Sequence, residues 1–472
     1  MKNILPLFLT AILLSAISCD SKEKDHVDQP EWISSINEQV KSWIDSESIL
    51  GAEILIVKDD KTALHEVYGW DDRDNNILLV KDQIFRIHSM TKPFTGTAIL
   101  MLSEEGKLSL DDKVSEYLEA YRNDNCRDIT IRQLLNHTAG FTQPAYPKGS
   151  IDLYESLGEA VMDLAEAGPK YEPGREYHYS DGHTASLGLI VAEITGEPAE
   201  KFIEERIFKP LGMKNSYCSL EGDEPDRDKV VDTYYWREGS YKKLWDNEDE
   251  PETPFFRASG GIATTAEDYS KFLSCWMKKG KYNGGQLLSE ETIIDALQTG
   301  EPNNAYGMHW EIYHELGNQS KMPVFGHGGS SGTLAMALPE QNAMVFYFTQ
   351  SRGTLTGNFL TRFILEELEY QEKKMTADME ISKSFLDRAK GDYLVGPETW
   401  ILDGNPDKLI FKSGRLVPLE FLPRSDSVFI NRFMDMKLIF DQIEENKEIG
   451  SFIFQVNGSS VPVSRATEKD ND

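Results

Sequence analysis

A serine and a lysine stand three residues apart at the start of a predicted helix, in the stretch from Phe85 to Phe94. Three residues is close to one helical turn, so the side chains of Ser89 and Lys92 would share a face. A serine hydroxyl is a weak nucleophile at neutral pH and needs a neighbouring base to accept its proton. Lys92 can be that base if its surroundings lower its pKa. The pair therefore predicts covalent catalysis on Ser89.

The residues after this pair predict a buried helix that begins here. Apolar side chains recur with helical spacing from Phe94 to Leu102, which would bury the helix and leave Ser89 at its N-terminus. The helix dipole favours developing negative charge at that end. Pro93 lacks the N–H that a continuing helix would need, so it fits a first turn.

The pattern S-x-x-K alone is weak evidence, because it occurs three times, at Ser21–Lys24, Ser240–Lys243 and Ser89–Lys92. The first lies in a charged run and the second in an expected polar loop; only the third opens an apolar helix. For an isolated match, a helix-capping serine with a solvated lysine is the better interpretation. Partners elsewhere in the chain must decide.

Two further groups of residues supply such partners. Tyr179-Ser180-Asp181 follows a turn signal and precedes an apolar run over 187–194, and His327-Gly328-Gly329 follows a short strand-like run. In this order, the three groups resemble the serine β-lactamase and penicillin-binding-protein superfamily. The resemblance is closest to the branch of class C β-lactamases, D-alanyl-D-alanine carboxypeptidases and related esterases. It extends from about residue 51 to 368 and includes the segments 130–140, 210–213 and 259–262 together with Asp268.

The resemblance implies an acyl-enzyme on Ser89, with the backbone N–H groups of Ser89 and Ser330 as oxyanion donors. Gly328 and Gly329 would leave room for a substrate along their strand. Tyr179 would lie near Lys92, whose ammonium would lower the pKa of the phenol. Either Lys92 or Tyr179 could then accept the proton of Ser89. The two would titrate as a unit, so the sequence does not choose between them.

Two positions depart from the class C pattern, which has asparagine where this chain has Asp181 and lysine where it has His327. Both residues are expected to contact the substrate, and both changes weaken the case for antibiotic hydrolysis. The sequence thus predicts an exported serine hydrolase acting on short esters, amides or D-amino-acid peptides. The alternatives are a β-lactamase and a penicillin-recognising or peptide-binding module without turnover.

A rival nucleophile exists, because the segment 328–332 matches G-x-S-x-G with Ser330 at its centre. That motif must turn from a strand into a helix. Here the following run over 333–338 ends at Pro339 and is followed by another strand-like run, which favours a hairpin.

Four histidines lie in or near these groups of residues. His178 and His183 flank Tyr179, but no H-E-x-x-H or paired cysteine spacing accompanies them, so no metal and no cofactor is predicted. His88 is expected to form a wall of the site, and His137 is expected to be structural.

The N-terminus has the pattern of an export signal. Residues 1–18 combine Lys2 with an apolar stretch too short to span a bilayer. Cys19 then stands where a bacterial lipobox would place a lipidated cysteine, and residues 19–30 would be a tether. The alternative is plain secretion. Three cysteines remain after processing, which argues against a disulfide framework but leaves one pair open.

Charge and composition limit the partners. A formal net charge of −30 makes binding to nucleic acid improbable, because phosphate contacts need a basic patch. The expected partners are a small-molecule or peptide substrate and a membrane reached only through the N-terminal lipid, on the periplasmic side or at the cell surface. The sequence carries no signal for an oligomeric state.

The predicted fold is α+β. A first helix over 31–46, a hairpin of 52–57 with 63–68, and late strands at 324–325, 333–338 and 343–349 suggest one antiparallel sheet built from both ends of a domain, with helices between. The resemblance implies that this hydrolase domain, 31–370, carries a helical subdomain beside the sheet. A linker over 371–384 and a small all-β, barrel-like domain over 385–472 would follow.

Overall fold

The computed structural model describes the chain over residues 31–220, 227–237, 240–245, 253–314, 322–352, 354, 356–367, 379–396, 398–413, 418–431, 436–440, 447–456 and 459–466. The export signal, Cys19 and the tether lie outside the described residues, as does most of the predicted linker.

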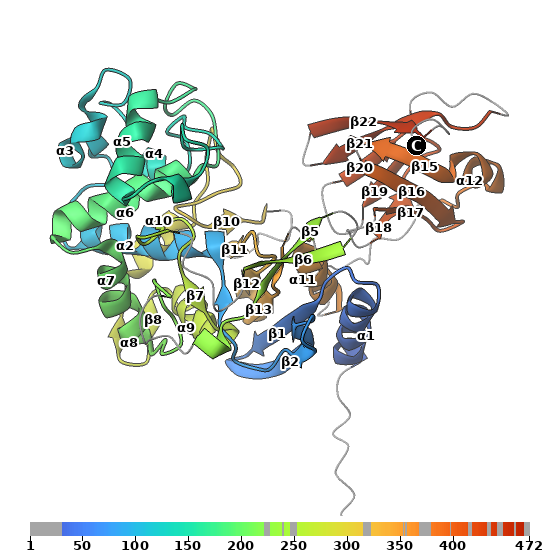
Figure 1. The fold of residues 1–472 in the computed structure, drawn as a ribbon, viewed down its shortest axis with the longest axis horizontal. Helices are drawn as coiled ribbons and strands as arrows, with labels where there is room; N and C mark the ends of the chain where they lie inside the picture. Colours follow the sequence, from blue (N-terminus) through green and yellow to red (C-terminus); the bar gives the residue numbers. More distant parts are fainter. Residues whose placement is uncertain are drawn as a thin grey trace, which may run out of the picture.

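One antiparallel sheet joins the two ends of the first domain (Figure 1). In spatial order its strands are β10 (Glu311–Ile312), β11 (Phe325–Gly328), β12 (Leu334–Leu338), β13 (Ala343–Phe348), β1 (Gly51–Lys58), β2 (Lys61–Asp72) and β3 (Ile77–Leu78). At the centre, Ile54 of the early hairpin faces Tyr347 of the late strands. The predicted sheet, assembled from distant parts of the sequence, is confirmed.

Helices cover both faces of this sheet because its central strands are apolar on both sides. α1 (Glu31–Asp45) and α11 (Thr356–Glu367) pack on one face, where Ile54 joins their hydrophobic cluster. α9 (Ala266–Met277) packs on the other, with Leu55. Alternate residues of β1 thus enter separate cores, as the two-residue period of a strand requires.

The helical subdomain lies beside the sheet (Figure 1). Its helices are α2 (Lys92–Glu104), α3 (Val114–Tyr117), α4 (Ile131–Leu135), α5 (Leu157–Ala167), α6 (Asp181–Thr195), α7 (Ala199–Ile203) and α8 (Lys209–Leu211), with α10 (Glu290–Ala296) nearby. α2 is buried from Lys92 to Leu102 and packs against α6. A helix buried on all sides is apolar all round, which explains the dense hydrophobic run after Ser89.

One predicted loop is wrong. Between residues 220 and 254 the chain forms β5 (Thr233–Arg237) and β6 (Ser240–Trp245), which pair with each other, and β5 also pairs with β14 (Ser351–Arg352). The buried aromatic rings of Tyr234, Tyr241 and Trp245 anchor these strands. Charged and polar residues stand among these aromatic residues, so the sequence shows no clear alternation of apolar and polar positions here. Two short pairs, β4 (Phe85–Arg86) with β7 (Ala263–Thr264) and β8 (Lys281–Tyr282) with β9 (Gly285–Gln286), complete the domain.

The C-terminal region is a closed eight-stranded barrel, which confirms the predicted all-β domain. Its strands are β15 (Gly391–Val395), β16 (Glu398–Asn405), β17 (Lys408–Lys412), β18 (Leu419–Pro423), β19 (Val428–Asn431), β20 (Met436–Ile439), β21 (Ser451–Val456) and β22 (Ser459–Arg465). α12 (Lys383–Ala389) packs against the barrel and takes in the last two residues of the predicted linker.

The three cysteines of the described residues form no disulfide. Cys126, Cys218 and Cys275 are free and buried, so the disulfide pair that the sequence left open does not form.

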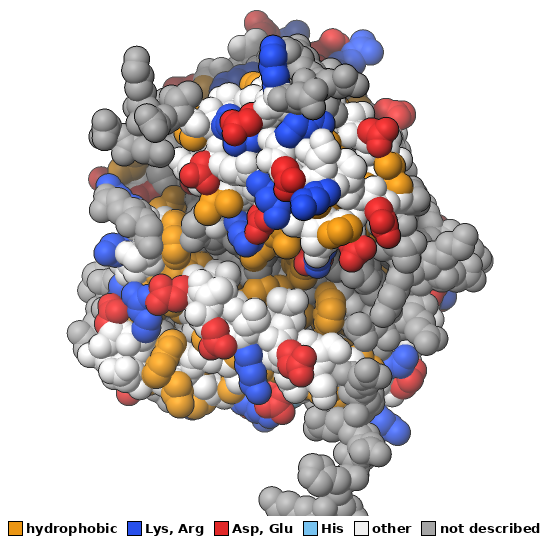
Figure 2. Space-filling view, turned by 90° about the vertical axis from the view of Figure 1, so that its right-hand side faces the viewer, with side chains coloured by type: hydrophobic (Ala, Val, Ile, Leu, Met, Phe, Trp, Pro, Cys, Tyr) orange, Lys and Arg blue, Asp and Glu red, His pale blue; other side chains and the backbone are white. Residues whose placement is uncertain are grey.

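The charged side chains are mixed on the face seen in Figure 2, where lysine and arginine lie among aspartate and glutamate. Among the helices of the described residues, none is both long and apolar enough to cross a bilayer.

Candidate active site

Ser89 lies in a single 3₁₀ turn, η1 (His88–Thr91), which runs directly into α2. The preceding strand β4 is held by β7, with Phe85 opposite Thr264. His88 has a left-handed φ of 43°, a conformation that costs energy for a residue with a side chain and turns the chain sharply into η1. His88 and Met90 are buried while Ser89 is only partly so. The turn therefore presents the serine to the outside.

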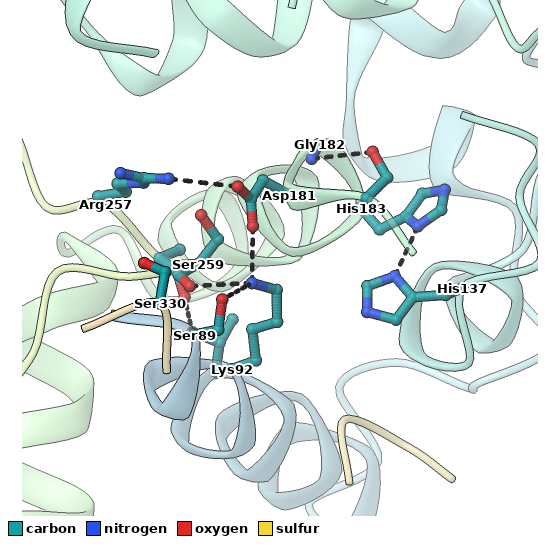
Figure 3. Close-up of polar contacts among 12 residues, drawn as sticks. Ser89, Lys92, His137, Asp181, Gly182, His183, Arg257, Ser259 and Ser330 are labelled. Carbon is teal, nitrogen blue, oxygen red and sulfur yellow. Dashed lines mark hydrogen bonds and ion pairs between the residues drawn. The ribbon is translucent and has the colours of Figure 1, made fainter. Parts of the chain in front are cut away.

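Lys92 is fully buried and its amine has three partners (Figure 3). Nζ lies 3.1 Å from Ser89 Oγ, 2.6 Å from Asp181 Oδ1 and 3.1 Å from the carbonyl oxygen of Ser259. Burial lowers the pKa of Lys92, and Asp181 opposes that shift in part. The net shift is downward, and a lower pKa is what Lys92 needs to act as a base for Ser89.

Asp181, the first residue of α6, is placed between two cations (Figure 3). Its Oδ1 accepts from Lys92 and its Oδ2 accepts from Arg257 at 3.2 Å. Burial would raise the pKa of this carboxyl, but Lys92 and Arg257 lower it well below its usual range. Asp181 is the residue that the sequence predicts to contact the substrate, and in the structure both of its oxygens have protein partners.

Tyr179 lies beside this pair, but its electrostatics differ from the prediction. The Lys92 amine is 4.7 Å from the centre of the Tyr179 ring. Burial and the Asp181 carboxylate raise the pKa of Tyr179 well above its usual value, and a hydrogen bond with Ser89 only partly offsets them. The expected lowering of this pKa was wrong, because burial of the phenol raises it most and the Asp181 carboxylate raises it further. Tyr179 is therefore a neutral phenol at physiological pH.

The turn after β11 packs onto the segment that carries Ser89. A side chain at Gly329 would place its Cβ 2.3 Å from the carbonyl oxygen of Ile87, so only glycine allows this approach. Ser331 Oγ donates to the carbonyl oxygen of Arg86 at 2.9 Å. Ser330 lies in the same turn, near Ser89 in Figure 3. Because β12 returns antiparallel to β11, the turn is a hairpin, and the elbow interpretation of Ser330 fails.

His327 is buried, and both of its ring nitrogens have protein partners. Nδ1 lies 2.8 Å from the carbonyl oxygen of Gly328, so it carries the proton and donates. Nε2 then accepts from the Tyr306 hydroxyl at 2.8 Å. Burial lowers the pKa of His327 below its usual value. The side chain expected to contact substrate is a neutral ring bonded within the protein, immediately beside the glycines of β11.

A layer of buried histidines lies behind Tyr179. The His137 ring is 4.6 Å from that of Tyr179, and His137 Nδ1 is 2.7 Å from His183 Nδ1 (Figure 3). Burial lowers the pKa of both histidines, and the pKa of His183 falls to about 3. His178 points elsewhere, stacked 4.0 Å from Tyr171. The two histidines that flank Tyr179 in sequence therefore do not converge on one site.

Sequence reasoning missed three groups that complete the cluster: Arg257, the Ser259 carbonyl and Tyr306. The only signal was indirect, since Arg257 stands just before the segment 259–262 that the family resemblance included. Arg257 also lines a pocket of about 220 Å³ with the aromatic side chains of Trp245, Phe255 and Phe256. Through Arg257, the polar cluster around Ser89 thus borders an open pocket that is partly aromatic.

Known proteins share both the sequence pattern and the architecture. The family model described as Beta-lactamase matches residues 31–369. The "Putative D-alanyl-D-alanine carboxypeptidase" of Escherichia coli strain K12 is 25% identical over 349 residues, which cover 64% of this chain and 79% of that protein.

Two solved structures have the same fold. The octameric penicillin-binding protein homologue from Pyrococcus abyssi has a TM-score of 0.64 at 19% identity and covers 92% of this chain and 100% of its own. EstCE1, a hydrolase with promiscuous acyltransferase activity, has a TM-score of 0.61 at 21% identity over 72% of this chain and 98% of its own. The family model spans the whole first domain, and that domain contains the Ser89–Lys92 pair. The chain therefore belongs to the beta-lactamase family.

Proposed function

We propose that the chain is an exported hydrolase that forms an acyl-enzyme on Ser89 and acts on short esters or D-amino-acid peptides. The observation that carries this proposal is the 3.1 Å contact between Lys92 Nζ and Ser89 Oγ, made by an amine whose pKa is lowered by burial. In its neutral form this nitrogen accepts the hydroxyl proton as the serine oxygen attacks a carbonyl carbon.

Lys92 is assigned as the base in preference to Tyr179. The raised pKa of Tyr179 keeps its proton in place, so the phenol can donate a hydrogen bond but not accept the serine proton. Lys92 then holds that proton as an ammonium paired with Asp181, and passes it to the leaving group when the carbonyl re-forms. Water then attacks the carbonyl carbon of the acyl-enzyme ester. Lys92 accepts the proton of this water and returns it to the oxygen of Ser89, which is released.

The negative charge of the tetrahedral intermediate needs two donors. The backbone N–H groups of Ser89 and Ser330 are assigned to it, because the Ser330 turn packs directly against Ile87 and Arg86. Gly328, where a side chain would meet only ordinary contacts, leaves the end of β11 clear for the substrate backbone, whereas Gly329 is needed for the packing against Ile87.

The substrate class follows from the charge around the site. His327 is neutral, and Arg257 is already paired with Asp181, so neither offers a free charge to a substrate carboxylate. This favours neutral esters and blocked peptides over β-lactams, whose carboxylate would find neither of these two side chains free. Among the described residues, the cation left at this turn is Arg352, whose guanidinium is 3.4 Å from Ser330 Oγ. The name of the Escherichia coli relative supports a D-amino-acid peptide as the acyl donor.

One experiment tests the acyl-enzyme. The purified hydrolase is mixed with a D-alanyl peptide, its methyl ester, a short p-nitrophenyl ester and a penicillin, and intact mass is recorded over time. The wild type should gain an acyl mass and release it, fastest with the esters. Ser89→Ala should gain none, whereas Ser330→Ala keeps its backbone N–H and should still acylate. An adduct mapped to Ser330, or none in the wild type with any substrate, overturns the proposal.

Export and lipid anchoring at Cys19 form a separate part of the proposal, supported by the apolar leader and the lipobox pattern. Expressed in a bacterium, the wild type should fractionate with the membrane, and Cys19→Ser should move it to the soluble fraction. A wild-type protein found only in the soluble fraction contradicts the anchor.

A further inference from the structure

A second cluster of ionisable side chains lies apart from the Ser89 site. Glu53 on β1, His65 on β2 and Asp82 in the segment between β3 and β4 each offer one ligand atom, and these atoms all lie within 4.8 Å of one another. Glu53 and His65 are already in contact, with Oε1 2.7 Å from Nε2. Glutamate and histidine reach each other here because both face the same side of the paired strands.

Glu53 is the unusual member, because it is a carboxylate in the middle of a sheet with no exposed surface. His65 occupies one of its oxygens. The other, Oε2, is buried and makes no hydrogen bond of regular geometry among the described residues, and the backbone N–H of Asp82 interacts with this carboxylate only weakly. An unsatisfied carboxylate oxygen away from water is costly, and natural proteins normally pair such a group or bind a cation with it. A Glu–His hydrogen bond alone therefore does not account for this site.

Charge at the cluster points the same way. Burial raises the pKa of Glu53, His65 offsets that shift in part, and the nearby Asp82 carboxylate adds to it. The Glu53 contact raises the pKa of His65. A divalent cation held between Glu53, His65 and Asp82 would supply positive charge to the buried Glu53 carboxylate.

We propose that Glu53, His65 and Asp82 bind a divalent transition-metal ion, with zinc as the best match. Zinc takes nitrogen and oxygen ligands at about 2.0–2.2 Å in a tetrahedron, which sets ligand atoms roughly 3.3 Å apart. The observed ligand atoms span 2.7 to within 4.8 Å, so small side-chain movements suffice. Water would supply the fourth ligand. Calcium and magnesium fit poorly, because they prefer sites made of oxygen alone.

The position of the cluster gives the metal a structural role. Asp82 belongs to the same short segment as β4 and Ser89, and its neighbour Ile84 is held by a backbone bond to Lys229. A metal bridging Asp82 to β1 and β2 would fasten the start of this segment to the sheet. The inference does not depend on the proposed hydrolase activity, because metal binding is measured directly.

The test uses the purified protein after chelator treatment, titrated with zinc, cobalt, calcium and magnesium in turn. Calorimetry should give one zinc per chain, and saturating zinc should raise the melting temperature by roughly 5 °C. Cobalt should produce a visible absorption band, while calcium and magnesium should leave the melting temperature unchanged. Because His65 and Asp82 are accessible at the surface, His65→Asn and Asp82→Asn should fold and lose both zinc signals.

Glu66→Gln is the matched control, since it removes a carboxylate from the next position of β2, on the opposite face of the strand. This variant should bind zinc like the wild type. Zinc binding that survives in His65→Asn would place the metal elsewhere, for instance among the buried histidines, and would overturn the inference. Absence of any zinc signal in the wild type would overturn it as well.

Discussion

Two lysines in the described part of the chain follow a serine by three residues, and only one of them is placed for catalysis. Lys92 begins a helix, where residues three apart share a face, and its amine meets Ser89 at 3.1 Å. Lys243 lies on β6, where side chains alternate between faces, so Ser240 and Lys243 point in opposite directions. The same four-letter pattern acquires chemistry only when the backbone is helical.

The two lysines also differ in how carboxylates surround them. Lys92 is fully buried and shares one carboxylate, Asp181, with Arg257, and burial lowers the pKa of its amine. Lys243 is about a quarter exposed. Partial burial would lower its pKa, but hydrogen bonds to Asp232 at 2.6 Å and Asp72 at 3.0 Å raise it well above its usual value. A buried lysine can lose its proton only where carboxylates do not outnumber cations.

Replacing each lysine by methionine should separate the two sites most strongly. Lys92→Met removes the proposed base, so kcat/KM for the best ester should fall roughly 10³-fold, a size typical of lost general-base catalysis. Lys243→Met should leave kcat/KM within about threefold and lower the melting temperature instead. Steady-state kinetics and thermal denaturation of both variants provide the measurement. Equal losses of kcat/KM would mean that Lys92 only maintains the fold.

The same comparison shows what the sequence could predict. Helical spacing identified the Ser89–Lys92 pair, and strand alternation identified the sheet, because both depend on neighbours along the chain. Arg257 approaches Asp181 from a loop 76 residues away, and that distance in sequence carries no periodic signal. The pKa of Tyr179 was mispredicted for a related reason, since burial is set by packing from several distant segments.

Changing the charges around Lys92 should move the pH dependence of the reaction in opposite directions. Asp181→Asn removes the group that raises the pKa of Lys92, and Arg257→Gln removes a cation that lowers it. Catalysis needs neutral Lys92, so kcat/KM rises with pH through that pKa. The rising limb should shift down by about one pH unit in Asp181→Asn and up by a similar amount in Arg257→Gln.

The Lys243 cluster supplies the control for this shift. Asp72→Asn removes a carboxylate from the other lysine and should leave the rising limb in place. Profiles of kcat/KM against pH for a neutral ester, with all variants side by side, give the comparison. A shift of the same sign in Asp181→Asn and Arg257→Gln would show that the limb does not report Lys92.

Tyr179→Phe should lower kcat/KM without shifting the pH at which kcat/KM rises. The phenol keeps its proton at physiological pH because burial and Asp181 raise its pKa, so its contribution is a hydrogen bond near Ser89. Loss of that bond should lower kcat/KM by about 10- to 100-fold, with the apparent pKa of the profile within about 0.3 unit of the wild type. A limb that disappears in Tyr179→Phe would make the tyrosine the base after all.

The smallest expected effect lies at the carboxylates around Lys243 and concerns the free energy of unfolding. Burial raises the pKa of Asp232 to about 6, against an ordinary value of 3.8 for the unfolded chain. The folded state therefore binds this proton more tightly, so Asp232 adds stability as pH falls from about 6 toward 4, and that contribution is lost as pH rises through about 6. Full burial would make this roughly 3 kcal/mol, but solvent near the partly exposed Lys243 screens the site, and about 1 kcal/mol is expected. An asparagine at this position cannot titrate. The unfolding free energy of the wild type minus that of Asp232→Asn should therefore be about 1 kcal/mol larger at pH 4.5 than at pH 7. Urea denaturation at both pH values measures it, and comparing differences cancels the titration of the other carboxylates. A difference that is smaller at pH 4.5 would mean that Lys243 holds Asp232 ionised, as Lys92 and Arg257 hold Asp181 at the other site.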